Sequence, residues 1–532
     1  MVKHVQKSAW WWAITSGVLQ VLVFPKPNFY FLGWVALAPL IYALLRSREA
    51  TSSRKLAEQD TFSYLVPAST GQGFLLGWAS GTIFFLGTCY WLYDVMKLHG
   101  GLSVTVSLLL LLLLALAAGL AEGLFGALVA RAAEAEEGFS RKALVLAPFL
   151  WVTIELLRSH VWNFPWNLLG YAQVDNIPLA RLAAVTGVYG ISFEIAVVNV
   201  AFATAFLVRP RRRRKLLLAA AICAAMLQSS QFIPFPSSPH SATALLVQQN
   251  LPLDGEWTPE EYEQTLTAFE GLSTKQTQGA NLVVWPESPA PFFLNDERFT
   301  QTLGRIAQSD KAWVVAGSLG IPTGENPAQE IYNSAVLVGP DGRVASRYDK
   351  LHLVPWGEYV PLKRLMPFID SLTHESGNFR PGNERGLLNA GELPLGTFIC
   401  YEAVFPGEVR RFAERGGQLF INISDDGWFG SSAAPLQHLR MARMRAIENE
   451  RWLLRDTDTG ITASIDPLGR VVMQAERDRR LAIAVPYGAI SEQTFYTQFG
   501  DWFPILCAII SLVVLLWRHR TVPEMPDAQP VG

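Results

Sequence analysis

The sequence predicts a membrane α-helical bundle of about eight transmembrane helices joined to one α/β domain. The first observation is composition: 50% of the 532 residues are hydrophobic and the mean hydropathy is +0.21, which is high for a soluble enzyme. The second is distribution, because residues 236–497 contain no apolar stretch long enough to cross a bilayer. We therefore expect a bundle at 1–235 with about seven spans, a globular domain at 236–497, a final transmembrane helix at 498–519 and a tail at 520–532.

Apolar stretches close to the roughly 17 to 25 residues of a transmembrane helix define the bundle. They are residues 9–24, 29–45, 73–97, 102–130, 143–158, 185–208, 216–232 and 502–517. Eight crossings would leave both ends of the chain on the same side of the membrane.

Basic residues predict the orientation, because short cytoplasmic loops are enriched in Lys and Arg. With eight spans, every basic cluster falls on one side; the clusters are Lys3, Lys7, Arg46, Arg48, Arg54, Lys55, Arg131, Arg141, Lys142, residues 209–215, Arg518 and Arg520. We therefore expect a cytoplasmic tail, with the domain at 236–497 on the opposite side, which in a bacterium is the periplasm. The net charge of −2 implies no attraction to nucleic acid, and we expect no nucleic-acid partner.

Short apolar runs alternate with helical patterns in the globular part, which predicts an α/β layered domain. The expected strands are residues 243–248, 281–285, 312–317, 334–338, 396–400, 418–424 and 461–465. The expected helices are residues 260–277, 299–309, 407–415 and 436–450. Gly-Pro-Asp-Gly at 339–342 and Asp-Pro-Leu-Gly at 466–469 predict β-turns of hairpins.

Cys400 is the one cysteine outside the predicted spans, since Cys89, Cys223 and Cys507 all lie within them. A structural disulfide is therefore not expected. Cys400 ends the apolar run 395–400, at a predicted passage from strand to helix. A lone cysteine more often packs as a small hydrophobic residue, so its function depends on its partners.

Glu287, just past a strand, and Lys350 supply what a nucleophilic thiol needs. A free thiol must lose its proton to attack, and Glu287 is the predicted general base. Lys350 is the predicted stabiliser of the oxyanion, alongside a backbone N–H such as that of Tyr401. The acyl group would rest on sulfur as a thioester, and His352 remains a rival base.

Glu287, Lys350 and Cys400 and their surroundings resemble the nitrilase (carbon-nitrogen hydrolase) superfamily in order and local context. A wider set of motifs extends over nearly the whole chain: NFPWNLLGYAQ at 163–173, WPES at 285–288, YDKLHLVPWGEYVP at 348–361, FICYEAVFP at 398–406, NISDDGWFG at 422–430 and QHLRMARMRAIE at 437–448. Together these motifs resemble the bacterial apolipoprotein N-acyltransferase family.

The resemblance implies a nitrilase-like αββα sandwich held on the periplasmic side of the bacterial cytoplasmic (inner) membrane. It implies transfer of an acyl chain from a phospholipid, usually phosphatidylethanolamine, to the α-amine of the diacylglyceryl-cysteine that begins an apolipoprotein. The roles that it implies are Glu287 as base, Lys350 as oxyanion stabiliser, Cys400 as nucleophile, Glu358, Tyr401 and Glu402 as supporting residues, and Trp257 at the substrate entry.

No phosphate-binding loop or dinucleotide fingerprint is present, and we expect no cofactor. Asp425 and Asp426 lack a further ligand at metal-binding spacing, so we expect no metal and interpret both as solvated loop carboxylates. Three positions depart from the family, which commonly has Phe at Trp356 and Asn at Asp425 and Asp458. These departures would alter the shape or charge of the acyl or acceptor pocket.

Two other functions remain open from the residues alone. A membrane-anchored amidase or nitrilase would hydrolyse a small C–N bond through the same three residues, although it leaves the many spans without a purpose. A transporter or scaffold would use the domain only for binding, which the presence of all three reactive residues disfavours. Replacement of Cys400 separates the enzymes from the binding protein.

Overall fold

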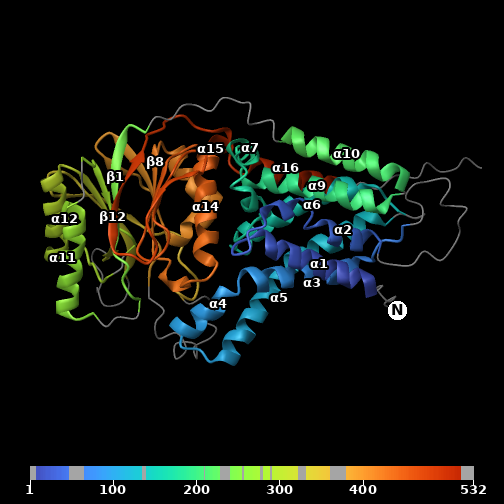
Figure 1. Cartoon of the computed structure of the whole chain (residues 1–532), viewed down its shortest axis with the longest axis horizontal. Coiled ribbons are helices and arrows are strands. Elements are labelled where there is room, and N and C mark those ends of the chain that lie inside the picture. The colour runs from blue at the N-terminus through green and yellow to red at the C-terminus, as the bar shows by residue number, and fades with distance from the viewer. Residues whose placement is uncertain are drawn as a thin grey trace, which may run out of the picture.

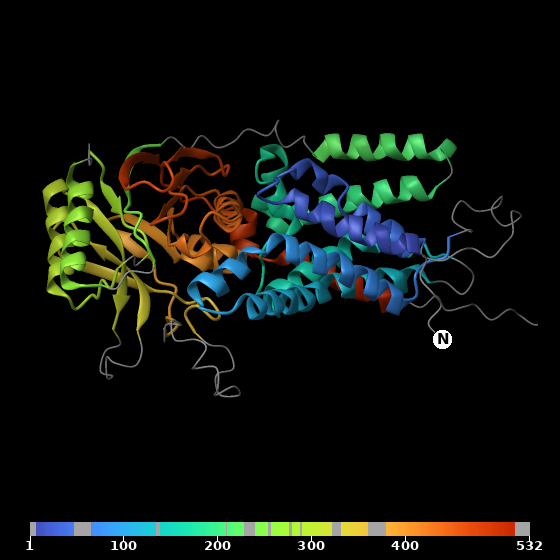
Figure 2. The same cartoon turned by 60° about the horizontal axis from the view of Figure 1, so that its bottom comes forward.

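The chain folds into a helical bundle and a two-sheet domain that lie end to end, with the N-terminus at the far end of the bundle (Figures 1 and 2). This computed structural model describes residues 7–46, 65–134, 139–208, 210–227, 240–253, 257–275, 279–287, 290–321, 331–359 and 379–516. The predicted tail at 520–532 and the basic residues Lys3, Arg48, Arg54, Lys55, Arg209 and Arg518 lie outside these ranges.

Eight helices make up most of the bundle: α1 (Lys7–Val23), α2 (Ala38–Leu45), α3 (Thr70–Thr88), α5 (Val104–Ala133), α6 (Lys142–His160), α9 (Val188–Leu207), α10 (Pro210–Leu227) and α16 (Trp502–Leu516). Shorter segments connect them: η1 (Tyr30–Trp34), α4 (Trp91–Asp94), η3 (Val95–His99), η4 (Leu169–Gln173), α7 (Ile177–Ala180), α8 (Ala183–Thr186) and α15 (Phe495–Phe499). Within the described residues, α5, α6 and α9 are long and apolar enough to cross a membrane. A fourth span is possible if α3 and the segment Trp91–His99 are taken together.

Three predicted stretches are not single straight helices. The stretch at 29–45 consists of η1 and α2, separated by residues 35–37. The stretch at 73–97 bends by 55° between α3 and α4, where Trp91 packs against Trp166 with ring centroids 5.1 Å apart. The stretch at 185–208 is broken at Gly187, whose φ of +65° favours glycine. Tertiary packing also favours glycine at position 187, because a Cβ there would lie 2.7 Å from the Tyr496 ring.

Glycines allow α3 and α5 to approach closely. A Cβ added at Gly77 would lie 2.1 Å from the Glu122 carbonyl oxygen, and one at Gly126 would lie 2.2 Å from that of Gly73. Small residues at three- and four-residue spacing are the usual means of bringing membrane helices together, since lipid provides little hydrophobic force between helices. This pair therefore forms a tightly packed centre of the bundle.

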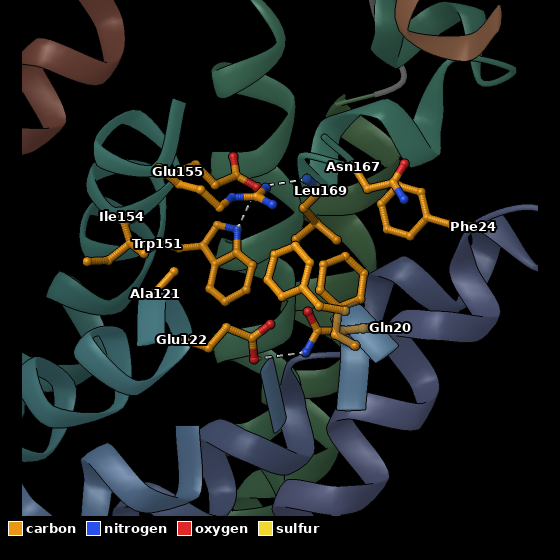
Figure 3. Close-up of a pocket in the computed structure, with 12 residues that line it drawn as sticks. Gln20, Phe24, Ala121, Glu122, Trp151, Ile154, Glu155, Asn167 and Leu169 are labelled. Carbon is orange, nitrogen blue, oxygen red and sulfur yellow. Dashed lines mark hydrogen bonds between the residues drawn. The ribbon is translucent and has the colours of Figure 1, made fainter. Parts of the chain in front are cut away.

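A small cavity lined by both apolar and polar side chains lies inside the bundle (Figure 3). Its volume is about 20 Å³, on the scale of one water molecule. Glu155 accepts hydrogen bonds from the Leu169 N–H at 2.7 Å and from the Trp151 indole at 3.2 Å, and Gln20 donates to Glu122 at 3.3 Å. Ionisable groups inside membrane proteins need such partners. The lining includes none of the predicted catalytic residues, so this cavity is separate from the candidate active site.

Two six-stranded sheets form the domain. The first has the order β12-β1-β2-β3-β4-β5 and the second the order β11-β10-β9-β8-β7-β6. The strands of the first are β1 (Ala242–Gln248), β2 (Leu282–Val284), β3 (Trp313–Gly320), β4 (Tyr332–Val338), β5 (Val344–Asp349) and β12 (Leu481–Tyr487). Those of the second are β6 (Leu388–Ala390), β7 (Leu393–Ile399), β8 (Leu419–Ser424), β9 (Leu453–Thr457), β10 (Ala463–Ile465) and β11 (Val471–Gln474).

The sheets pack face to face, and helices cover their outer faces. Leu246 and Val284 of the first sheet share one buried cluster with Phe398 and Ile421 of the second. Helices α11 (Pro259–Lys275) and α12 (Glu297–Asp310) cover the first sheet, and α14 (Ala434–Asn449) covers the second (Figure 1). Helix α13 (Pro406–Glu414) also packs on the second sheet, through Val409 and Phe412. The predicted α/β domain is thus confirmed, as a four-layer αββα sandwich.

All seven predicted strands and four predicted helices of the domain are present, within a few residues at their ends. Both predicted hairpin turns are confirmed as well. Gly342 donates its N–H to the Gly339 carbonyl at 2.8 Å between β4 and β5, and Gly469 does the same to Asp466 at 2.8 Å between β10 and β11. The strands β5, β6, β9, β11 and β12 were not expected.

Helix α14 lies between the second sheet and the bundle (Figure 1). Its Gln437 donates to the backbone carbonyls of Pro25 and Thr88 of the bundle, at 3.1 Å each, and accepts from the Trp166 indole at 2.8 Å. Its Glu448 accepts from the Val188 N–H at 3.1 Å. These buried contacts join the two parts of the chain across one helix.

Candidate active site

Glu287, Lys350 and Cys400 each follow the end of a strand. Glu287 lies three residues past β2, Lys350 directly follows β5, and Cys400 directly follows β7. The first two come from one sheet and Cys400 from the other. Lys350 contacts Glu287 directly at 3.1 Å, and Glu402, two residues after Cys400, accepts the N–H groups of both Leu351 and Ile399, so the fold brings the three groups together.

Lys350 is buried between two carboxylates. Its Nζ lies 3.1 Å from Glu287 Oε1 and 2.9 Å from Glu358 Oε1, and the side chain of Lys350 is 1% exposed. Burial alone would lower the pKa of Lys350, but Glu287 and Glu358 raise it well above the usual lysine value. Lys350 therefore keeps its positive charge in the interior, as an oxyanion stabiliser must.

Asn333 on β4 is a further member of this cluster that sequence analysis missed. Its Nδ2 donates to Glu287 Oε1 at 2.7 Å and to Glu358 Oε1 at 2.8 Å. The remaining oxygen of Glu287 accepts the Asp425 N–H at 2.9 Å. The only sequence signal was a polar residue immediately before the predicted strand at 334–338. Asn333 fixes the two carboxylates relative to one another and to Lys350.

Cys400 occupies a strained position at a sharp turn from strand to helix. Its φ is +48°, in the left-handed region that non-glycine residues rarely adopt. It is the first residue of the short helix η8 (Cys400–Val404) and is 8% exposed. A reactive side chain on such a turn is held away from the regular strand and helix that flank it. Backbone strain here is consistent with a functional role.

Burial raises the pKa of the Cys400 thiol well above its ordinary value; Glu287 raises it further and Lys350 lowers it. The thiol is therefore protonated in the resting protein, and its attack requires removal of the proton by a base. A carboxylate beside the thiol suits general-base catalysis rather than a preformed ion pair.

We predict no thiolate from Cys400 at neutral pH. Because the pKa is raised, the protonated form persists through the pH range in which a free cysteine ionises, and the thiolate should form only at more alkaline pH. The measurement is the ultraviolet thiolate absorbance of the wild type minus that of Cys400→Ala during a pH titration. A thiolate difference already present at neutral pH would contradict this.

Glu402 clamps the nucleophile turn to the segment that carries Lys350. Oε1 accepts the Tyr348 hydroxyl at 2.8 Å and the N–H groups of Leu351 and His352 at 2.8 and 3.2 Å. Oε2 accepts the Ile399 N–H at 2.7 Å. The Glu402 side chain thus links residues on both sides of Lys350 to the end of β7. These contacts support the predicted role of Glu402 beside the reactive residues.

We expect Glu402→Gln to destabilise the protein by about 1–3 kcal/mol, because an amide has one acceptor oxygen and would turn its NH₂ toward backbone N–H groups. The change should also lower acyl transfer by loosening Lys350. Thermal unfolding and activity measure the two effects. Glu414→Gln is the matched control, since Glu414 is 43% exposed and the change should stay within about 0.5 kcal/mol. Equal stabilities for the two variants would contradict the clamp.

The other predicted site residues are placed as follows. Glu358 joins the cluster directly, and its Oε2 accepts the Val354 N–H at 2.7 Å. The Tyr401 ring packs on Phe405, with centroids 5.1 Å apart. Trp257 is exposed ahead of α11, and its part in substrate entry stays a prediction.

His352, the rival base, stacks on Phe405 with ring centroids 3.8 Å apart. Burial, Arg385 and Lys350 together lower the pKa of His352 to about 4. The ring is therefore neutral at physiological pH. The structure gives Glu287, rather than His352, the contact with Lys350.

Asp425 and Asp426 correct the sequence interpretation, because neither is a solvated loop carboxylate. Strand β8 ends at Ser424 and leaves Asp425 8% exposed and Asp426 fully buried. Asp425 accepts from the Gly427 N–H at 2.9 Å, and Asp426 accepts from Arg455 at 2.7 Å. These partners, distant in sequence for Asp426, make burial tolerable. In the described ranges, no group of three or more His, Cys, Asp or Glu residues has an arrangement that could hold a metal ion.

Two family models match the chain, one over the helical bundle and one over the two-sheet domain. Residues 16–201 match the apolipoprotein N-acyltransferase N-terminal domain, and residues 243–486 match the carbon-nitrogen hydrolase family. A solved amidase of the nitrilase superfamily from Nesterenkonia is 20% identical with a TM-score of 0.37, covering 49% of this chain and 95% of that one.

Several relatives with similarity over nearly the full length of the chain are named apolipoprotein N-acyltransferase. The one from Geobacter metallireducens is 34% identical over 527 residues, which cover 96% of this chain and 95% of the relative. The one from Methylococcus capsulatus is 32% identical over 526 residues, covering 97% and 98%. With this identity sustained across the bundle and the sandwich alike, the chain belongs to the apolipoprotein N-acyltransferase family.

Proposed function

We propose that this protein transfers an acyl chain from a membrane phospholipid, through a thioester on Cys400, to the N-terminal amine of diacylglyceryl-cysteine in apolipoproteins. Phosphatidylethanolamine is the proposed donor. The observation that carries the proposal is the buried cluster of Glu287, Lys350 and Glu358 beside Cys400, at the end of the domain that contacts a membrane bundle. Membership of the apolipoprotein N-acyltransferase family supports the choice of an apolipoprotein as acyl acceptor and a lipid as acyl donor.

In the first half-reaction, the Cys400 sulfur attacks the ester carbonyl of the phospholipid while Glu287 takes the thiol proton. The carbonyl oxygen becomes an oxyanion, which the Lys350 ammonium and the Tyr401 N–H stabilise. The C–O bond of the ester then breaks, and Glu287 returns the proton to the departing alcohol. The products are a lysophospholipid and an acyl-Cys400 thioester, so every atom and proton is accounted for.

In the second half-reaction, the free amine of the lipoprotein attacks the thioester. Glu287 takes a proton from the amine, the same two donors stabilise the oxyanion, and the C–S bond breaks. The proton goes back to the Cys400 sulfur as the amide forms. The acyl group is already activated, first as the phospholipid ester and then as the thioester. Formation of the amide therefore needs no nucleotide cofactor to activate the acyl group.

The position of Cys400 against the bundle suits lipid substrates. The Tyr401 hydroxyl donates to the Asn163 carbonyl at 3.4 Å, and the Tyr401 ring lies stacked with Trp166, with centroids 6.5 Å apart. Both partners come from the segment that follows α6. A nucleophile held there meets lipid chains without their transfer into water, which would require about 0.8 kcal/mol for each CH₂.

We further propose that the bundle spans the bacterial inner membrane about eight times, with the catalytic domain at 236–497 in the periplasm. The bundle at 1–235, the final helix at 498–519 and the tail at 520–532 complete this arrangement. The basic clusters support it, and the N-terminus lies at the end of the bundle remote from the domain (Figure 1). Fusions of a periplasm-dependent reporter after residue 275 should be active and after residue 134 inactive; the reverse would refute the orientation.

The test of the proposed function uses purified protein in detergent with phosphatidylethanolamine and a synthetic diacylglyceryl-cysteine peptide. We expect the peptide to gain one acyl chain as an amide, and the same peptide with a blocked amine to gain none. Hydrolysis of small amides without acyl transfer would favour the anchored amidase instead. Peptide binding without any reaction would favour the transporter or scaffold.

A further inference from the structure

The feature that carries this inference is His438 on α14, a buried histidine in contact with the backbone of the nucleophile. Its Nε2 lies 3.0 Å from the Cys400 carbonyl oxygen, and its Nδ1 lies 2.9 Å from Asp426 Oδ1. Arg455 Nη2 lies 2.7 Å from Asp426 Oδ2. The exposed fraction is 1% for His438 and zero for Asp426 and Arg455. The ring is therefore held in place on both sides.

The carbonyl oxygen determines which ring nitrogen carries hydrogen. A carbonyl only accepts, so His438 must carry a proton on Nε2 and donate it to Cys400. The opposite side of the ring faces Asp426, whose pKa burial alone would raise but Arg455 and His438 together lower. Nδ1 also lies 3.1 Å from Arg455 Nη2, which can donate to it, so the ion pair of Asp426 and Arg455 orients the imidazole.

The peptide bond between Cys400 and Tyr401 transmits this contact to the reacting atoms. A peptide unit is planar, and in the trans form its C=O and N–H point in opposite directions. A hydrogen bond that fixes the Cys400 carbonyl therefore also fixes the direction of the Tyr401 N–H. It also polarises that N–H, because hydrogen bonds in series strengthen one another. The Tyr401 N–H is the backbone donor proposed above for the oxyanion.

The backbone at Cys400 needs such an anchor. With φ at +48°, the residue is in a conformation of higher energy, which persists only when its surroundings impose it. His438 supplies a contact from a separate element, α14, which also meets the bundle through the neighbouring Gln437. Trp166 lies beside His438, with ring centroids 6.1 Å apart. The turn is thereby held by groups from both parts of the chain.

We infer that His438 is a positioning residue for the oxyanion site: through the Cys400 carbonyl it aims the Tyr401 N–H at the tetrahedral intermediate. The inference rests on the proposed function, because it requires acyl transfer at Cys400. It differs from a base role, since His438 contacts the backbone of Cys400 and exchanges no proton with the thiol. Loss of the contact should slow steps that form an oxyanion and leave other reactions of the thiol unchanged.

The test compares two reactions of Cys400 in the full-length protein. One is acylation from labelled phosphatidylethanolamine, which forms an oxyanion. The other is reaction with methyl methanethiosulfonate, in which the thiol attacks sulfur and no oxyanion arises. The variants are His438→Leu, which cannot donate, and His438→Gln, whose amide can. His160→Gln is the matched control, because His160 is 55% exposed and contacts Asp501 away from the nucleophile.

We expect His438→Leu to lower the acylation rate by roughly tenfold to a hundredfold. This decrease is smaller than the roughly 10²–10³-fold decrease in kcat that follows when an oxyanion donor itself is removed. His438→Gln should recover most of this loss, and the thiosulfonate rate should stay within about twofold for all variants. Unchanged acylation in His438→Leu, equal losses in both reactions, or no recovery with Gln would each overturn the inference. If wild-type Cys400 takes no acyl label, the proposed function fails and the inference fails with it.

Discussion

Cys400→Ala should abolish acyl transfer, with a loss of about 10⁴-fold or more, because removal of a covalent nucleophile leaves only binding and oxyanion contacts. The fold should survive, since Cys400 is a small buried side chain and alanine fits its space. The measurement is N-acylation of a diacylated peptide together with thermal unfolding. Loss of activity without loss of stability assigns the reaction to the thiol.

The other described cysteines provide the control for this prediction. Cys89 and Cys507 are also free and buried, but both lie in the bundle. Cys89→Ala and Cys507→Ala should therefore keep transfer near the wild-type rate. Residual transfer by Cys400→Ala above a hundredth of wild type would show that the acyl group does not pass through this sulfur.

Lys350→Met should cause the second largest effect, on both activity and stability. Loss of the ammonium removes one of the two oxyanion donors, for which the expected decrease in kcat is about 10²–10³-fold. It also leaves Glu287 and Glu358 buried without their cation, and breaking a buried ion pair in this way destabilises by about 3–5 kcal/mol. Activity and denaturant unfolding measure the two effects separately.

The sign of the pH dependence follows from the same contacts. The pKa of Lys350 is raised above that of the unfolded chain, so its stabilisation is complete at neutral pH and is lost only as pH rises toward the raised value. The difference in stability between wild type and Lys350→Met should therefore shrink at strongly alkaline pH. Arg343→Met, at an exposed hairpin turn, is the control. A constant difference up to the pH of alkaline unfolding would contradict the pairing.

The sequence predicted the sandwich because its apolar strands are short, regular and bounded by strong turn signals. Strand β9 was not predicted because it contains Arg455 and Asp456, and adjacent charged residues are typical of a polar loop. Both side chains are fully buried, and their partners, Asp426 for Arg455 and the Val247 N–H for Asp456, are distant in sequence. Burial of that kind cannot be inferred from local pattern.

In the candidate site, too, residues with a local sequence signal were predicted, and residues that depend on distant partners were not. Glu287 and Cys400 stand out because each follows an apolar run, and Lys350 stands out within the motif at 348–361. The structure places all three just past strand ends. Asn333 and His438 were not singled out, since a polar residue in a strand or helix has no distinct signature. Their roles arise from contacts with residues distant in sequence, Glu287 for Asn333 and Cys400 for His438. The break at Gly187 likewise depends on Tyr496, more than 300 residues away.

The most direct measurement of the central claim omits the acceptor. Purified protein in detergent is mixed with a phospholipid that is labelled on one acyl chain, and Cys400 is examined for label that hydroxylamine releases. We expect label on Cys400, none on Cys400→Ser, and rapid discharge when a diacylated lipopeptide with a free amine is added. An unlabelled Cys400 in protein that still hydrolyses small amides would contradict the acyl-thioester account.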